Sequence, residues 1–441
     1  MSHDFVHRGV EILVGDCLDR LKDMPDESVD CCVTSPPYWG LRQYGDEKKQ
    51  LGMENTPEEF VENLVIVFRE VRRVLKPTGS LWLNLGDTYY GGKGRSGAGT
   101  AETHESRTSP TLQKEHSYLG VKGESRPHAR PHPVLKSKDL CLIPHRVAIA
   151  LQADGWWLRQ DLVWAKPNCM PESVKDRCTR NHEYLFLLTK SKHYFFDSEA
   201  IKEKAVNQKQ SGRNMTDTRT TYGPQNGGNS GLRDLRKEGL PTHRNKRSVW
   251  WIPPRPFGGA HFAVFPPELI EPCILAGTSA KGCCSDCGSP WKRTVGKSCS
   301  ECGGFVPSQA NQCPHCEHRN TDWREGRTVS EPHRSDDFGE SGRRVPRRNK
   351  IDNKTTISTW DTTCDCDAEL IPAVVLDPFG GSGTVAGVAI KHDRRATLIE
   401  LNSDYAKLMP KRIDSIASQQ NIRDAEHERV VGKTSFDEWF A

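Results

Sequence analysis

The sequence predicts an α/β fold in which a parallel sheet is covered by helices on both faces. Short apolar strands alternate with helical segments through the first ninety residues, and the alternation returns from Leu140 to about Phe196. A third observation is a strand at Ala373–Leu376 that runs into a glycine-rich turn and a helix. Alternating strands and helices favour parallel pairing, because each crossover helix carries the chain back over the sheet.

Each predicted strand is a short apolar run, and the longest predicted helix repeats apolar residues every three or four positions. Lys76–Gly79, which reads Lys-Pro-Thr-Gly, is expected to stop that helix. The strands are expected at Val10–Val14, Val29–Thr34, Ser80–Leu85, Gln160–Trp164, Tyr184–Leu188, Ala373–Leu376 and Ala396–Ile399, with helices that begin at Cys17 and span Thr56–Leu75. The segment His261–Gly277 is apolar and fits either a helix or a strand.

Three polar stretches interrupt this pattern. Residues 91–137 are rich in Gly, Ser, His, Arg and Pro and are expected to form a flexible insertion. Residues 200–248 are basic, with eleven Lys and Arg against four Asp and Glu between Ile201 and Trp250, which suits phosphate contact or a solvated loop. Residues 281–370 are rich in cysteine. The main domain is therefore expected in four pieces, 1–90, 138–199, 249–280 and 371–415, followed by a C-terminal tail at 416–441.

Composition limits the setting in which the protein works. The 441 residues carry a net charge of +4, so overall charge does not identify a nucleic-acid partner. No run approaches the roughly 18 apolar residues of a membrane helix. The N-terminus, Met1 to Asp4, lacks the basic start and apolar run of a secretory signal. A cytoplasmic protein without membrane spans is expected.

A first chemical motif, Ser35-Pro36-Pro37-Tyr38, follows directly after a strand, where open α/β sheets bind ligands. An exocyclic base amine is a poor nucleophile because its lone pair is delocalised into the ring, and acceptors that bind its hydrogens make it reactive. Ser35 and the carbonyl of Pro36 are the expected acceptors, and the Pro36-Pro37 step holds that carbonyl rigidly. Tyr38 offers a face for a base that has left the duplex. A plain proline-rich turn is the alternative.

A second motif, residues 377–384, reads Asp-Pro-Phe-Gly-Gly-Ser-Gly-Thr after a strand and opens a helix, so backbone can approach a nucleotide-like cofactor closely. The next strand ends in Glu400, which can accept both ribose hydroxyls. No Gly-Lys-Ser/Thr follows, which argues against a phosphate loop and suits S-adenosylmethionine. Asp16 is either a contact for the cofactor's adenine amine or a turn or cap residue. The other candidate cofactor residues are Asp377, Phe379, Gly381, Gly383, Thr384 and Glu400.

Residues 34–38 resemble the catalytic signature of the amino-directed DNA methyltransferases, and residues 377–384 resemble the adenosylmethionine loop of that family. The catalytic motif precedes the cofactor loop, as in the family's beta arrangement. Residues 164–168, 182–197 and 261–266 are similar to further segments of the family. The resemblance covers over half of the chain.

The resemblance implies a Rossmann-like sheet of seven strands, with the catalytic half at 1–90 and the adenosylmethionine-binding half at 371–415. It implies methyl transfer to the exocyclic amine of a base in double-stranded DNA, with residues 200–248 in the position of the target-recognition region. Serine before Pro-Pro-Tyr is more typical of the cytosine enzymes, so Ser35 favours cytosine N4 over adenine N6. A cognate restriction endonuclease is a possible partner.

Several alternatives stay open at this point. The target could be adenine, or RNA could replace DNA. A zinc-dependent nucleic-acid-binding protein with an inactive methyltransferase fold is an alternative from another class, and the two intact motifs argue against it. Pro272-Cys273 is similar to the nucleophilic Pro-Cys of enzymes that methylate ring carbon. However, Leu269 and Ile270 share an apolar helical face with Cys273, which favours a buried thiol.

The cysteines predict metal sites. Nine of the 16 lie between Cys283 and Cys366, which in a cytoplasmic chain indicates metal binding in place of disulfides. Two Cys-x-x-Cys knuckles complete one tetrahedral structural zinc site. The predicted inner site is Cys299, Cys302, Cys313 and Cys316, and the predicted outer site is Cys284, Cys287, Cys364 and Cys366. Cys283 is a competing outer ligand, and reduced thiols are the alternative. Contact of this insertion with DNA stays open, since four arginines lie near it: Arg343, Arg344, Arg347 and Arg348.

Overall fold

A computed structural model of the chain describes residues 4–40, 50–91, 127, 130–204, 243–255, 264–299, 302, 304–307, 310, 312–317 and 356–430. Most of the expected flexible insertion and recognition region lies outside these residues, as do the four arginines at 343–348, the segment 261–263 and the end of the C-terminal tail. Among the described helices, none is both long and apolar enough to cross a bilayer.

The chain divides into two compact units. The first comprises Met1–Ile201, Lys246–Pro290 and Cys364–Ala441, and the second comprises Lys202–Asn245 and Trp291–Thr363. Both ends of the cysteine-rich insertion, up to Pro290 and from Cys364, therefore belong to the first unit.

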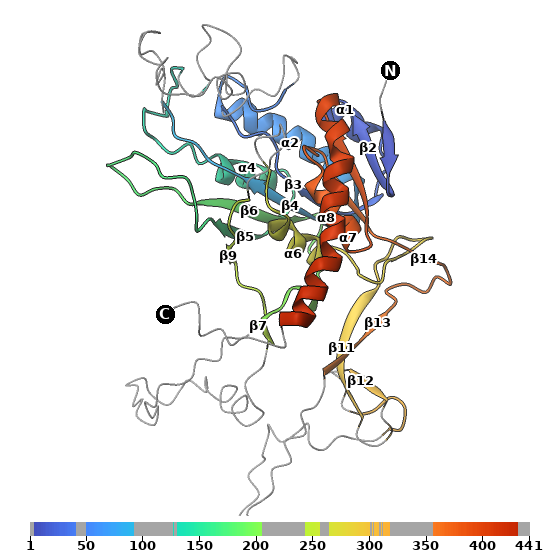
Figure 1. Cartoon of the computed structure of the whole chain (residues 1–441). Helices are drawn as coiled ribbons and strands as arrows, with labels where there is room; N and C mark the ends of the chain where they lie inside the picture. The colour runs from blue at the N-terminus through green and yellow to red at the C-terminus, as the bar shows by residue number, and fades with distance from the viewer. Residues whose placement is uncertain are drawn as a thin grey trace, which may run out of the picture. The chain divides into compact units, whose positions relative to one another are not determined.

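In the first unit, the described residues form one nine-stranded sheet in the order β1-β2-β16-β15-β3-β4-β6-β5-β9 (Figure 1). Its strands are β1 (Phe5–His7), β2 (Val10–Val14), β3 (Val29–Thr34), β4 (Leu75–Leu85), β5 (Trp157–Ala165), β6 (His182–Thr189), β9 (Val249–Trp251), β15 (Val374–Asp377) and β16 (Arg395–Glu400). The seven strands expected from the apolar runs of the sequence are the inner ones. Three-residue strands, β1 and β9, extend the sheet at its two edges.

The sheet is mixed, so the expectation of a parallel sheet was wrong in part. β2, β16, β15, β3 and β4 run parallel, whereas β6 is antiparallel to both β4 and β5. β1 is also antiparallel to its neighbour. The physical reason at β6 is its connection: residues 166–181, all described, contain no helix. Parallel neighbours need a long crossover, whereas antiparallel neighbours do not.

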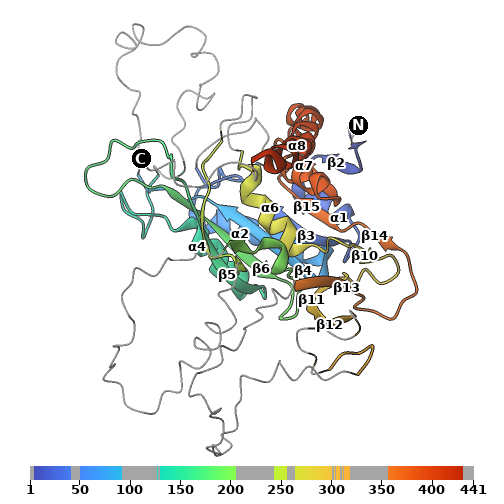
Figure 2. The ribbon, with the colours of Figure 1, turned by 60° about the horizontal axis from the view of Figure 1, so that its bottom comes forward.

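Helices cover both faces of the sheet. They are α1 (Cys17–Asp23), α2 (Pro57–Val74), α4 (Ile143–Ala153), α6 (Pro267–Gly277), α7 (Thr384–Lys391) and α8 (Ser403–Val430). Side chains alternate between the faces along a strand. On β3, Cys32 joins the core beneath α1, α2 and α4, while Cys31 and Val33 join the core beneath α6, α7 and α8. α7 and α8 lie side by side in both views (Figures 1 and 2).

α2 has the local signals of a stable helix. Thr56 caps its N-terminus by accepting a hydrogen bond from the backbone N–H of Glu59, and Pro57 occupies the first turn. The helix ends at Val74, next to the expected stop at Lys76–Gly79. The strand expected to start at Ser80 starts earlier, because β4 begins at Leu75 and contains this segment. Asp30 alone on β3 stands opposite these four residues, so they form an irregularity within the strand pair.

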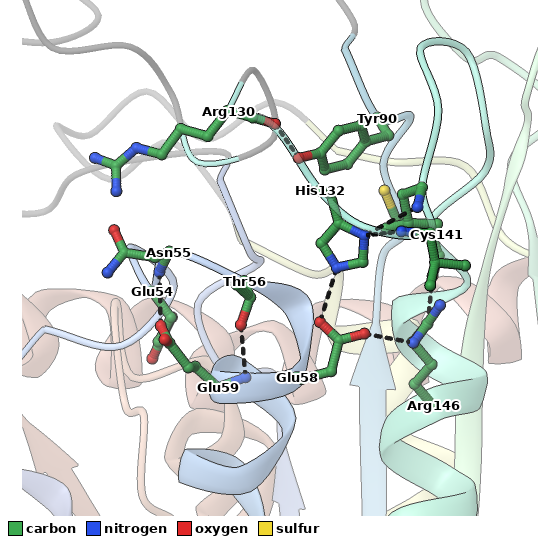
Figure 3. A network of polar contacts seen from close by, with 12 residues as sticks. Glu54, Asn55, Thr56, Glu58, Glu59, Tyr90, Arg130, His132, Cys141 and Arg146 are labelled. Atoms are coloured by element: carbon green, nitrogen blue, oxygen red, sulfur yellow. Dashed lines mark hydrogen bonds and ion pairs between the residues drawn. The ribbon is translucent and has the colours of Figure 1, made fainter.

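Residues 130–142 lead back to the sheet and are fastened to the start of α2 (Figure 3). His132 Nε2 lies 3.1 Å from Glu58 Oε2, and Arg146 Nη1 lies 3.0 Å from Glu58 Oε1. His132 Nδ1 accepts two backbone N–H groups, from Val134 and Leu135. Since Nδ1 is an acceptor, Nε2 carries the proton and donates to the Glu58 carboxylate.

Short elements complete the described residues of both units. In the first unit these are η2 (Glu199–Ile201) and the pair β10 (Cys283–Cys284) and β14 (Leu370–Ile371). The second unit holds the pair β7 (Glu203–Lys204) and β8 (His243–Arg244), and the sheet β12-β11-β13, visible in Figure 2. The strands of that sheet are β11 (Lys292–Ser298), β12 (Phe305–Pro307) and β13 (Thr356–Asp361).

Candidate active site

A cavity of about 420 Å³ lies in the first unit at one edge of the large sheet. β2, β3, β4, β15 and β16 all end at this edge because they run parallel. β6 begins there because it runs the other way. Residues that follow the parallel strands, together with the first residues of β6, therefore line a common space.

The structure brings ten of the eleven predicted catalytic and cofactor residues to this cavity. They are Asp16, Ser35, Pro36, Pro37, Tyr38, Asp377, Phe379, Gly381, Thr384 and Glu400. The eleventh, Gly383, is not among the lining residues. It stands before α7 with a φ of +82°, a conformation that glycine adopts without strain.

The side chain of Tyr38 is held from several directions. Its hydroxyl lies 2.8 Å from Glu183 Oε2 and 3.1 Å from Asn84 Oδ1, and the Ser35 hydroxyl donates to it over 3.4 Å. The ring lies against Gly86, where an added Cβ would come within 2.4 Å of Tyr38 Cε2. Glycine at position 86 is therefore a requirement for this position of the ring.

The cofactor-loop side of the cavity carries two buried carboxyl groups. Asp377 Oδ1 accepts hydrogen bonds from Thr34 Oγ1 at 2.6 Å and from the backbone N–H of Phe379 at 3.1 Å. The two oxygens of Glu400 accept the backbone N–H groups of Gly381 and Asn402. Burial raises the pKa of Asp377 to about 7 and the pKa of Glu400 to about 7.

Asp16 is a helix cap, which is one of the two interpretations that the sequence left open. Its side chain caps α1 by accepting the backbone N–H groups of Leu18 and Asp19 at 3.0 and 3.1 Å. It also lines the cavity. A role as a helix cap therefore does not exclude contact with a ligand.

Several lining residues were not singled out from the sequence. Lys166 and Glu183 form an ion pair, and the Lys166 ammonium lies 4.2 Å from the centre of the Trp164 ring. Lys166 and Glu183 both lie in segments that resemble the family, but neither belongs to a motif for which the sequence predicted a role. The signal available was a charged residue at the end of an apolar strand, which also fits a solvated position. The other lining residues of this kind include Asn84, Arg255, Phe265 and Tyr405.

Cys273 is a core residue. It is fully buried on α6, and its thiol donates to the carbonyl of Leu269 over 3.5 Å. Burial raises its pKa well above the ordinary value, so it is held as the protonated thiol. The described cavity lining does not include it. These observations support the buried-thiol interpretation over the nucleophile.

Eight of the predicted metal ligands form two tetracysteine clusters. Cys284, Cys287, Cys364 and Cys366 gather in the first unit, and Cys299, Cys302, Cys313 and Cys316 gather in the second. The sulfur atoms of each cluster all lie within 4.8 Å of one another. Cys283 is not part of the first cluster, because its thiol lies 3.2 Å from Asp30 Oδ1.

Comparison with known proteins agrees with the motifs. A family model described as a DNA methylase of the N6/N4 methyltransferase type matches residues 29–289. The chain belongs to this family of DNA methylases. It is 44% identical over 272 residues to the type II methyltransferase M.XycI of Xanthomonas campestris pv. cyanopsidis, covering 62% of this chain and 73% of the relative.

A second relative is the type II methyltransferase M.SmaI of Serratia marcescens, which is 40% identical over 276 residues, or 62% of this chain and 77% of the relative. Among solved structures, the PvuII DNA methyltransferase (cytosine-N4-specific) aligns over 93% of this chain and 92% of its own, with 15% identity and a TM-score of 0.43.

Proposed function

We propose that this DNA methylase transfers the methyl group of S-adenosylmethionine to the N4 amine of cytosine in double-stranded DNA, with adenine N6 as the alternative target. The observation that carries the proposal is the hydrogen bond between Thr34 and Asp377, because it brings the Ser35–Tyr38 motif and the cofactor loop to one cavity. S-adenosylmethionine supplies a methyl group on a sulfonium, which leaves as a neutral thioether.

The residues present fit this cofactor. Two buried carboxyl groups suit a molecule that carries hydroxyl, amino and sulfonium groups and no phosphate. In the proposal, Glu400 accepts the ribose hydroxyls, Asp16 accepts the adenine amine, and the loop of Asp377, Phe379, Gly381 and Thr384 surrounds the rest. Glu400 keeps lone pairs for the hydroxyls, since its oxygens accept the backbone N–H groups of Gly381 and Asn402 and a carboxylate has about four acceptor sites.

The catalytic side binds and orients the base. Ser35 and the carbonyl of Pro36 accept the amine hydrogens, and Pro37 keeps the carbonyl at a fixed angle. The ring of Tyr38, held against Gly86, offers a stacking surface. These acceptors fit the amine of either base. The choice of cytosine therefore depends on Ser35 alone, because a serine before Pro-Pro-Tyr is more typical of the cytosine enzymes in the family that the sequence resembles. Residues 200–248 would recognise the target sequence, and the type II names of both relatives make a restriction endonuclease a fitting partner.

Paired variants test the division of labour. Ser35→Ala should lower the rate of methyl transfer about 100-fold, as expected for loss of one pre-oriented polar group, and leave the Kd of S-adenosylmethionine within about twofold. Asp377→Asn should instead weaken cofactor binding about tenfold, since hydrogen bonds to charged groups contribute about 1.5–3 kcal/mol. Calorimetric titration and a tritium transfer assay measure both. Ser28→Ala, at a partly exposed serine outside the cavity lining, is the control. Full loss of cofactor binding in Ser35→Ala would contradict the assignment of Ser35 to the base and not to the cofactor.

We also propose one structural zinc ion in each tetracysteine cluster. A Zn–S bond of about 2.3 Å in a tetrahedron separates the sulfur atoms by about 3.8 Å. In the second unit, Cys299 Sγ lies 3.7 Å from Cys316 Sγ, and Cys302 Sγ lies 3.5 Å from Cys313 Sγ, which supports this fit. Four thiolates leave no open coordination position, so a structural role is expected.

A further inference from the structure

A hydrogen-bonded chain leads from the catalytic motif to a carboxylate on β6. The Ser35 hydroxyl donates to the Tyr38 hydroxyl over 3.4 Å, and the Tyr38 hydroxyl donates to Glu183 Oε2 over 2.8 Å. The direction of donation is the same at each link, from the motif toward Glu183. Ser35, Tyr38 and Glu183 all line the cavity.

Lys166 and Asn84 hold the far end of this chain in place. Lys166 Nζ donates to Glu183 Oε1, and both side chains are largely buried, with 20% and 16% of their surfaces exposed. The Lys166 ammonium is itself fixed over the Trp164 ring. Asn84 donates its amide N–H to the carbonyl of Tyr184, so its oxygen faces the Tyr38 hydroxyl.

Methyl transfer to an amine leaves one proton too many on the nitrogen. Ser35 and the Pro36 carbonyl can orient the amine, but neither a hydroxyl nor an amide carbonyl holds a proton near neutral pH. The reaction therefore needs a base within reach of the amine.

The geometry points to Glu183 as the acceptor of this proton, through Ser35 and Tyr38, an assignment that rests on the proposed function. The N–CH₃ bond forms as the S–CH₃ bond breaks, and the electron pair of the broken bond stays on sulfur. The amine proton passes to Ser35 Oγ, the Ser35 proton passes to Tyr38, and the Tyr38 proton passes to Glu183 Oε2. The carboxylic acid formed on Glu183 returns its proton to water after the products leave.

The other carboxyl groups of the described cavity lining are engaged elsewhere. Asp16 caps α1, and Asp377 accepts from Thr34 and from the Phe379 backbone. Glu400 accepts two backbone N–H groups beside the cofactor loop. Among the four carboxyl groups of the described lining, Glu183 is the one that accepts a hydrogen bond from Tyr38.

Substitution of Glu183 tests the assignment on the full-length protein with S-adenosylmethionine and duplex DNA. Glu183→Gln keeps a hydrogen-bond acceptor for Tyr38 but cannot take the proton. The single-turnover rate of methyl transfer should fall about 100-fold, the scale of lost general-base catalysis, while the Kd of S-adenosylmethionine stays within about twofold. Glu183→Asp should retain an intermediate rate. Glu172→Gln is the matched control, because Glu172 pairs with Arg177 outside the cavity lining.

A rescue experiment separates proton transfer from support of the fold. Formate added to Glu183→Ala should raise its rate at least tenfold, because a small carboxylate can occupy the space and take the proton. A Glu183→Gln rate within threefold of the wild type would overturn the assignment, as would loss of cofactor binding in that variant or absence of rescue by formate. If the wild type itself methylates no DNA, the proposed function fails instead.

Discussion

Thr34 Oγ1 lies 2.6 Å from Asp377 Oδ1, although the two residues are 343 positions apart in the sequence. Thr34 is the last residue of β3 and Asp377 is the last residue of β15, and both are buried. The two strands are direct parallel neighbours. This hydrogen bond therefore joins the start of the Ser35–Tyr38 motif to the start of the cofactor loop.

Thr34→Val should weaken cofactor binding. Valine has the shape of threonine but lacks the hydroxyl, so Asp377 loses the bond that lowers its pKa against the effect of burial. A lost bond to a charged group, about 1.5–3 kcal/mol, corresponds to a Kd about tenfold or more higher. Titration calorimetry at pH 7.5 measures this. Thr34→Ser keeps the hydroxyl and should bind nearly as the wild type does; equal affinity for Thr34→Val and wild type would contradict the role of this bond.

Cofactor binding should strengthen as the pH rises from 6 to 8. Burial raises the pKa of both Asp377 and Glu400 to about 7, so the free protein holds protons on these groups at pH 6. Only the ionised carboxylates accept the cofactor's donors at every lone pair. Calorimetric titration at pH 6, 7 and 8 should show the trend, and Glu400→Gln should weaken it to the part that Asp377 contributes. An affinity independent of pH would count against both carboxylates as ligands.

The same two groups predict how the stability of the cofactor-free protein depends on pH. An unfolded Asp or Glu has a pKa near 4, so between about pH 4 and 7 the unfolded chain has released protons that the folded protein retains. The contribution of these groups to the free energy of unfolding therefore falls as the pH rises through this range, and is constant above it. Comparing urea unfolding of the wild type and Asp377→Asn at pH 5 and 7.5 isolates the contribution of Asp377, which should be absent in the variant, whereas that of Glu400 should remain.

Gly86→Ala should slow methyl transfer without affecting the cofactor. The new Cβ would lie 2.4 Å from Tyr38 Cε2, so the ring must move and its hydroxyl contacts are disturbed. A displacement of about 1 Å at a catalytic group can cost about 100-fold in rate. Gly155→Ala is the control, since a Cβ there meets nothing within 4 Å. Its backbone strain should lower stability only. An unchanged rate for Gly86→Ala would show that the position of the Tyr38 ring is not critical.

Elemental analysis of purified protein should give about two zinc ions per chain. Changing Cys302 and Cys316 to Ser should remove one ion, from the second unit, and leave the other. Changing Cys287 and Cys366 to Ser should lower the melting temperature of the first unit more than changing Cys302 and Cys316 does. Cys283, beside the first cluster, contacts Asp30, which also bonds the backbone of Val374 at the start of β15. A stable protein without metal would refute both sites.

The elements that the sequence predicted well are those with local signals. Apolar runs located β2 and β3 at the observed bounds, and apolar periodicity located α2. The turn residues Lys76–Gly79 marked the end of α2 correctly but hid the early start of β4, because the irregularity there depends on Asp30 of the neighbouring strand. The antiparallel direction of β6 depends on a connection without a helix, and the strand pattern alone does not reveal direction.

The site was predictable where one continuous segment carries the chemistry. Ser35–Tyr38 and residues 377–384 were found in this way. Glu183 and Lys166 were not, because their ion pair and the contact with Tyr38 join three distant segments. A charged residue near a strand end is common at solvated positions, and only the packing of β5 beside β6 brings these two to the cavity.

Nucleoside mass spectrometry tests the central claim most directly. Duplex DNA of diverse sequence is incubated with the zinc-loaded wild type and S-adenosylmethionine, then digested to nucleosides. The account predicts N4-methylcytosine that depends on the cofactor and is nearly lost with Ser35→Ala. Exclusive N6-methyladenine would overturn the choice of base and leave the reaction class intact. No methylated nucleoside from a protein that binds both S-adenosylmethionine and DNA would contradict the account.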